Sequence, residues 1–152
     1  IEEDLQSLRN AGVVVENQTK EEMANFTGST EEIEAWKRYV RSANSQFIVG
    51  RGLYVIQLRQ WLAQMDKVEK PRSDLLLIQS EKLQQEYNRI LAFLGLSEEE
   101  VPPKEDFVLP PKISMPPEIR KKLETFYAPY NRQLYDLLGY EWEGIWDPKE
   151  ET

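Results

Sequence analysis

Three consecutive stretches decide the fold of this chain: RGLYVIQLRQWLAQM at residues 51–65, DLLLIQ at residues 74–79 and SEKLQQEYNRILAFLGL at residues 80–96. The second is continuously apolar and too short for a helix of its own, which is typical of a buried strand. The third begins at Ser80, a residue type that caps helices, and ends at Gly95. The order helix, strand, helix predicts an α/β layer with one strand at about 74–79. The first stretch predicts a helix whose apolar residues share one face: Tyr54, Leu58, Trp61, Leu62 and Met65.

Helices are also predicted on both sides of this block. Residues 1–8 form an amphipathic pattern, and Ser29 or Thr30 can cap a further helix, with Glu32 as the capping-box partner of Ser29. Between them, residues 10–28 read as a polar loop that could serve as a lid. Residues 118–139 predict two helices, interrupted at Pro129 and ended by Gly139. An aromatic segment follows that we expect to pack back on the body: Tyr140, Trp142, Ile145 and Trp146.

The composition excludes several classes of function. A net charge of −8 argues against a general binder of nucleic acid or of anionic membranes, since either needs a basic face. The chain has no cysteine and no histidine, which excludes disulfides, thiolate metal sites, Ser-His-Asp chemistry and the usual zinc sites. The apolar runs are far shorter than a membrane span. We therefore expect a cytoplasmic protein without a bound metal.

Several short motifs of the sequence occur in the order found in one enzyme family. They are RGLY at residues 51–54, QLRQWL at 57–62, SEKL at 80–83, FLGL at 93–96 and a tail that starts with MPPEIR at 115–120. With these motifs, residues 46–146 resemble the C-terminal half of sulfotransferases that use phosphoadenosine phosphosulfate (PAPS), especially the bacterial and heparan-sulfate-type branch. The resemblance implies a P-loop-NTPase-like sulfotransferase fold. Residues 1–146 would be the mostly helical C-terminal part of that single domain, and residues 147–152 a frayed tail or linker.

The resemblance also implies a nucleotide contact in the proline-rich segment at residues 102–117. In the family this region folds over PAPS or its product PAP, and by position Phe107, Lys112 and Ser114 would take that role. The sequence departs from the family pattern at Val108 and Ile113, where an Asn and an aromatic residue are usual. These departures bear on the individual assignments rather than on the segment.

Three further residues are candidates for binding. Arg51 lies between two glycines at a helix start, where a cation is unfavourable unless an anion sits nearby, so it is a candidate contact for the cofactor. The alternative for Arg51 is a surface salt bridge. Tyr54 and Trp36 are candidates for contacts with the substrate, and the alternative for both is a place in the core.

The predicted reaction is transfer of a sulfuryl group from PAPS to an acceptor hydroxyl. The family's phosphosulfate loop, its lysine and its general base have no counterpart in this sequence, so no catalytic residue is assigned. We expect the chain to be inactive without the missing N-terminal half of the domain. An acidic chain repels polyanionic glycans, which favours a small-molecule or carrier-bound acyl acceptor in a bacterial cytoplasm.

Two other classes of function stay open at this point. The chain can be a helical interaction module, which predicts an exposed apolar groove and no anion site near Arg51. It can also be a degenerate sulfotransferase-like domain that is kept for its structure and has no activity.

Overall fold

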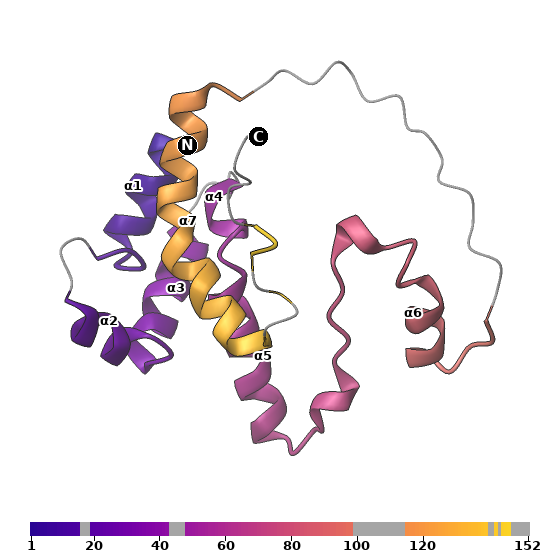
Figure 1. Cartoon of the computed structure of the whole chain (residues 1–152). Helices are drawn as coiled ribbons and strands as arrows, with labels where there is room; N and C mark the ends of the chain where they lie inside the picture. The colour runs from indigo at the N-terminus through magenta and orange to yellow at the C-terminus, as the bar shows by residue number, and fades with distance from the viewer. Residues whose placement is uncertain (16–18, 43–47, 99–114, 140–141, 143, 147–152) are drawn as a thin grey trace. The chain divides into compact units, whose positions relative to one another are not determined.

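The computed structural model describes residues 1–15, 19–42, 48–98, 115–139, 142 and 144–146. The chain divides into two compact units, with Ile1–Gln64 and Met115–Thr152 as unit 1 and Met65–Ser114 as unit 2. The expectation that residues 1–146 belong to one domain stays a prediction. The helices of the described residues are labelled in chain order (Figure 1): α1 Glu2–Asn10, α2 Lys20–Phe26, α3 Thr30–Ser42, α4 Ile48–Arg51, α5 Tyr54–Lys67, α6 Tyr87–Phe93 and α7 Pro117–Leu138, with short 3-10 turns η1 Arg72–Asp74 and η2 Ser80–Lys82.

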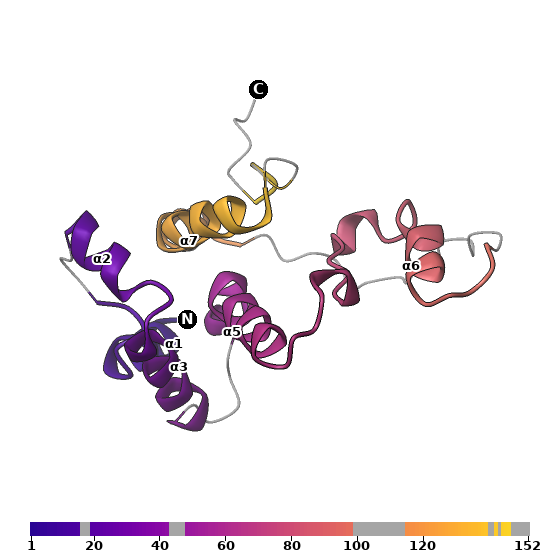
Figure 2. The same ribbon diagram turned by 90° about the horizontal axis from the view of Figure 1, so that it is seen from below.

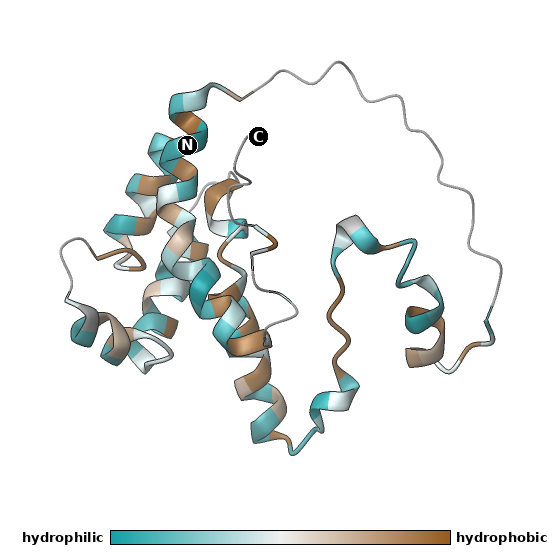
Figure 3. Ribbon diagram, viewed as in Figure 1, coloured by the Kyte–Doolittle hydropathy of each residue, from teal (hydrophilic) through white to brown (hydrophobic). Residues whose placement is uncertain are grey.

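The strand predicted at residues 74–79 does not form, and the predicted α/β fold of the P-loop-NTPase-like kind is wrong. The described residues contain helices and no strand. Leu75 and Gln79 have extended backbone angles, but the turns η1 and η2 close the segment at both ends. Figure 3 shows it as an apolar stretch between the two turns. A strand needs a neighbour to bond with, and no other described segment supplies one.

The helix predicted from Ser80 begins later, at Tyr87. Ser80 lies inside η2 and so cannot cap a helix, and the residue before α6 is Glu86. The predicted end is confirmed. Gly95 has a positive φ of 72°, and the N–H of Leu96 donates to the carbonyl of Leu91 at 2.9 Å, which closes the helix.

Helices α1 and α3 of unit 1 form where the sequence predicts them. The Ser29 hydroxyl accepts a hydrogen bond from the Glu32 N–H at 3.1 Å, as expected for the cap of α3. The return bond comes from Gly28, whose N–H donates to the Glu32 carboxylate at 2.9 Å, and not from Ser29. Helix α1 lies beside α3 (Figure 2) and also contacts α4, which buries Leu5, Leu8, Ala35 and Tyr39.

The predicted loop at residues 10–28 contains helix α2, so the loop prediction is wrong there. The Thr19 hydroxyl accepts from the Glu22 N–H at 3.2 Å, and the Glu22 carboxylate accepts from the Thr19 N–H at 2.8 Å. These reciprocal bonds form a capping box. The hydrogen bond from the Thr19 backbone lowers the pKa of Glu22. The residue pattern of this capping box is present in the sequence. The suggestion of a lid at residues 10–28 depended on a loop, and helix α2 removes that support.

Helix α5 buries only part of the predicted face, since Leu62 is buried and Leu58 packs against the core. Its buried residues are Val55, Ile56 and Leu62, whereas Tyr54 and Trp61 are 53% and 68% exposed. The interpretation of Tyr54 as a core residue is therefore wrong. The buried face is set by the residues that α5 packs against in the core of unit 1, and those residues are distant in the sequence.

Helix α7 runs through Pro129 without a break, so the two predicted tail helices are one. Proline lacks an N–H and crowds the preceding turn, which usually interrupts a helix. Here the apolar residues on both sides of Pro129, among them Phe126, Tyr130 and Leu134, pack against the core of unit 1 and hold α7 in one piece. Gly139 ends the helix as predicted.

The aromatic segment after α7 packs back on unit 1, which confirms the prediction for its described residues. Trp142 is buried. The ring of Trp146 stacks on that of Tyr135 with centroids 6.1 Å apart, and the backbone N–H of Trp146 donates to the Tyr135 hydroxyl at 3.1 Å. Tyr140 lies outside the described residues.

Candidate functional site

Gly50 and Arg51 are the last residues of α4, and Gly52 and Leu53 connect α4 to α5 in a tight turn. The prediction that Arg51 lies at a helix start is therefore wrong, because it lies in the last turn of α4, where a cation is favourable. The N–H of Gly52 donates to the carbonyl of Val49 at 3.1 Å, and the N–H of Leu53 donates to that of Gly50 at 3.0 Å. Both glycines are needed here because tyrosine rings lie against their backbone. A Cβ added to Gly50 would lie 2.5 Å from Cε1 of Tyr39, and one added to Gly52 would lie 2.8 Å from Cε1 of Tyr127.

Hydrogen bonds to buried groups fix the backbone of this turn. The Asp4 carboxylate accepts from the Tyr39 hydroxyl at 2.5 Å and from the Val49 N–H at 2.7 Å. The Tyr127 hydroxyl donates to the Val49 carbonyl at 2.7 Å. Helices α1, α3 and α7 thereby each supply one side chain that holds α4 in place. Asp4, at the centre of the network, is only 8% exposed.

The two tyrosines of this network remain protonated to high pH. Burial, followed by the hydrogen bond to Asp4, raises the pKa of Tyr39. Burial, followed by the nearby Asp4 charge, raises the pKa of Tyr127 to about 12. Both hydroxyls are therefore lasting hydrogen-bond donors.

Arg51 and Trp36 line the same open cavity, of about 130 Å³, together with Val40, Gly50 and Gln57. Arg51 is exposed, and its guanidinium makes no hydrogen bond or ion pair with another described residue. The Gln57 side chain instead donates to the Arg51 carbonyl at 3.2 Å. No acidic side chain is among the described residues that line the cavity. It can thus offer an unpaired cation and an indole ring to one small anionic group.

The other predicted site residues are not part of this cavity. Tyr54 does not line it, and its ring lies 6.0 Å from that of Trp146. Phe107, Lys112 and Ser114 lie outside the described residues. Arg51 and Trp36 are therefore the predicted residues that the structure brings together.

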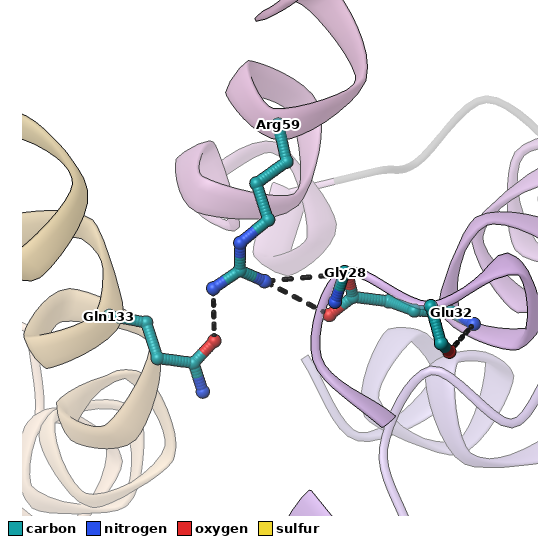
Figure 4. A network of polar contacts seen from close by, with 5 residues as sticks. Gly28, Glu32, Arg59 and Gln133 are labelled. Carbon is teal, nitrogen blue, oxygen red and sulfur yellow. Dashed lines mark hydrogen bonds and ion pairs between the residues drawn. The ribbon is translucent and has the colours of Figure 1, made fainter. Parts of the chain in front are cut away.

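A buried ion pair that the sequence reasoning missed connects three helices of unit 1. Arg59 of α5 donates to the carboxylate of Glu32 on α3 at 3.2 Å and to Oε1 of Gln133 on α7 at 2.7 Å (Figure 4). The side chains of Arg59 and Glu32 are 19% and 5% exposed. The available signal was a charged residue next to the apolar face of α5, but its partners are too distant in sequence to be inferred.

The rest of the described chain adds two observations on the kind of site. Among these residues no helix combines the length and the apolar character needed to cross a membrane. Within the same ranges, no group of acidic side chains is arranged to hold a metal ion. Comparison with protein-family models, with curated proteins and with solved structures finds no match.

Proposed function

We propose that this chain is part of a sulfotransferase that moves a sulfuryl group from PAPS to an acceptor hydroxyl. The observation that carries the proposal is the position of Arg51, an unpaired guanidinium among the described residues, beside Trp36 at an open cavity. The sequence motifs RGLY at residues 51–54 and QLRQWL at residues 57–62 support the same function. The proposal rests on these residues and not on the fold.

The proposed role of Arg51 is to hold one anionic group of the nucleotide. An engineered cavity of about 150 Å³ accommodates a benzene ring, so about 130 Å³ suits a single phosphate or sulfonate group and not a whole nucleotide. A charge-assisted hydrogen bond from a guanidinium is stronger than a neutral one. The net charge of −8 repels anions from the chain as a whole. An anion would therefore be attracted to this cavity only by the local positive charge of Arg51.

PAPS, when bound, supplies the sulfuryl group and leaves as the anion PAP. The acceptor we propose is a small-molecule or carrier-bound hydroxyl, because a chain this acidic repels long polyanionic glycans. Transfer needs donors that stabilise the leaving phosphate and a base that removes the acceptor proton. No residue of this chain is proposed as that base.

The test uses PAPS with radiolabelled sulfur and the chain expressed with whatever sequence its gene encodes on either side. We expect transfer to a hydroxylated acceptor, and a fall in kcat/KM for PAPS of about tenfold to hundredfold in Arg51→Ala, the loss of one charged hydrogen bond. Arg51→Lys should recover part of it. The matched control is Arg41→Ala, an exposed arginine of α3 that does not line the cavity. Equal effects of the Arg51 and Arg41 variants, or no turnover and no PAP binding, would overturn the proposal.

A helical interaction module is the second candidate, and one observation favours it. Tyr54 and Trp61 lie seven residues apart on α5, and both are more than half exposed. Large apolar residues repeated at this spacing are typical of a helix that packs on another helix. Sedimentation of the chain should then show self-association that Trp61→Ala abolishes, together with no effect of Arg51→Ala on any PAPS-dependent reaction.

A further inference from the structure

A second cavity of unit 1 lies away from Arg51 and has a different chemistry. Its volume is about 130 Å³, and it lies between the segment after α1, the end of α2 and the middle of α7. Apolar side chains form most of its wall, including Val13, Val15, Met23, Phe26 and Phe126. The same cavity has a polar edge, formed by Thr27, Tyr130 and Gln133.

The polar edge presents hydrogen-bond donors that have no acceptor among the described residues. The Tyr130 hydroxyl makes no hydrogen bond to another described residue. Burial, with a smaller effect of the Glu32 charge, raises the pKa of Tyr130 to about 12, so the hydroxyl keeps its proton. A protonated phenol beside an apolar wall can donate to a ligand oxygen.

The Gln133 side chain is oriented so that its amide nitrogen has no hydrogen-bond acceptor among the described residues. Its Oε1 accepts from Nη2 of Arg59 at 2.7 Å, and an arginine can only donate, so the oxygen must face Arg59. The amide N–H groups of Gln133 then have no acceptor among the described residues. A group of donors without acceptors favours a ligand that brings an acceptor.

The charge around the polar edge favours a neutral ligand. The ion pair next to it, Glu32 with Arg59, is complete, because the carboxylate and the guanidinium contact each other at 3.2 Å. Neither an anion nor a cation would find an unpaired counter-charge there. An uncharged oxygen meets the donors without the cost of burying a charge.

We propose that this cavity binds a neutral small molecule of about six to eight heavy atoms with one carbonyl or hydroxyl oxygen. Its apolar body contacts Phe26 and Phe126, and its oxygen accepts from Tyr130 or Gln133. The proposal is independent of sulfuryl transfer and of the cavity at Arg51.

The test is an NMR titration of the chain with cyclohexanone and with methylenecyclohexane, which has the same shape but no oxygen. We expect cyclohexanone to shift the amide signals of residues 13–15, 26–27 and 130–133. It should bind about three- to tenfold more tightly than the hydrocarbon, which is the contribution of one hydrogen bond. Tyr130→Phe should reduce that difference, because Gln133 remains as a donor, and should leave the affinity for the hydrocarbon unchanged.

A second set of variants tests the position of the ligand. Met23→Trp and Val15→Phe place bulk in the cavity from exposed positions, so the fold should tolerate them. Each should weaken cyclohexanone binding at least about tenfold. Met115→Trp, at a similarly exposed methionine outside the cavity, should not. No saturable shift with cyclohexanone, or binding that is unchanged in both cavity variants, would overturn the proposal.

Discussion

The hydroxyl of Tyr39 on α3 donates a 2.5 Å hydrogen bond to the carboxylate of Asp4 on α1. The same carboxylate accepts the N–H of Val49 at the start of the turn that carries Arg51. Asp4 thus connects the N-terminal helix to the candidate anion site, although it does not line the cavity itself.

Removing the Asp4 carboxylate should destabilise the chain. Asp4→Ala removes the acceptor of the buried Val49 N–H and breaks the hydrogen bond from the Tyr39 hydroxyl, and a buried donor that loses its acceptor costs about 1 to 3 kcal/mol. We expect the free energy of unfolding, measured with urea, to fall by about 3 kcal/mol or more. Glu3→Ala is the matched control, since Glu3 is the exposed neighbour of Asp4 on α1. A loss no greater than that of Glu3→Ala would show that the network contributes little.

Gly50→Ala should be far more damaging than Gly28→Ala. The added Cβ at position 50 would lie 2.5 Å from Cε1 and 2.6 Å from Cζ of Tyr39, atoms of a buried ring that cannot move aside. We expect a loss of about 3 kcal/mol, at the upper end of overpacking effects. Gly28 has open space around it and only a positive φ of 75°, so its loss should be about 1 kcal/mol. Thermal or urea unfolding of the pair checks this, and similar losses would contradict the steric explanation.

Alkali should destabilise unit 1 between pH 10 and about 12. The ordinary tyrosine pKa is 10.0, and burial raises those of Tyr127 and Tyr130 to about 12. In that interval the folded chain binds more protons than the unfolded chain, so the free energy of unfolding falls as pH rises. Below pH 10 this contribution is fully present.

The measurement is the ultraviolet absorbance of tyrosinate, followed with urea unfolding at each pH. Tyr130→Phe should reduce the loss of stability, because Tyr130 makes no hydrogen bond to a described residue that the substitution would break. Tyr87→Phe in unit 2 is the control and should leave the alkaline loss in unit 1 as it was. Identical pH profiles for the two variants would contradict the shifted pKa of Tyr130.

Breaking the ion pair of Glu32 and Arg59 should cost more than breaking an exposed one. Arg59→Ala leaves a carboxylate that is 5% exposed without its cation, and an uncompensated buried charge costs about 3 to 5 kcal/mol. The pair Lys37 with Glu34 on α3 is about half exposed on both sides, and Lys37→Ala should produce no measurable change. Urea unfolding of both variants checks this, and the result fails if Arg59→Ala is as mild as Lys37→Ala.

The sequence predicted those parts of the fold that depend on neighbours along the chain. The Ser29 cap and the stop at Gly95 are local, and both were predicted correctly. The strand at 74–79 was wrong because strand formation depends on a distant partner that apolar composition cannot reveal. Continuity through Pro129 depends likewise on packing between α7 and residues near the other end of the chain.

The candidate site, like the fold, could be predicted only in those parts that depend on local sequence. Arg51 was selected because two glycines flank a cation at a predicted helix start, although the structure places it in the last turn of α4. Trp36 was selected because it is an aromatic residue on a predicted helix. That both line one cavity could not be predicted, since it depends on the turn held by Asp4, Tyr39 and Tyr127. The sequence did not identify Asp4, Tyr39 and Tyr127 as residues that hold this turn, because each resembles an ordinary polar or core residue.

The hydrogen bond from Tyr127 to Val49 joins residues that are 78 positions apart. At a synthesis rate of about 5 to 20 residues per second, α7 emerges from the ribosome roughly 4 to 16 seconds after the turn it covers. During that interval the apolar side chains of Leu53, Val55 and Ile56 lack the helix that later packs over them. The nascent chain therefore passes through a stage at which chaperones can bind it, and truncation before α7 should yield a product prone to aggregate.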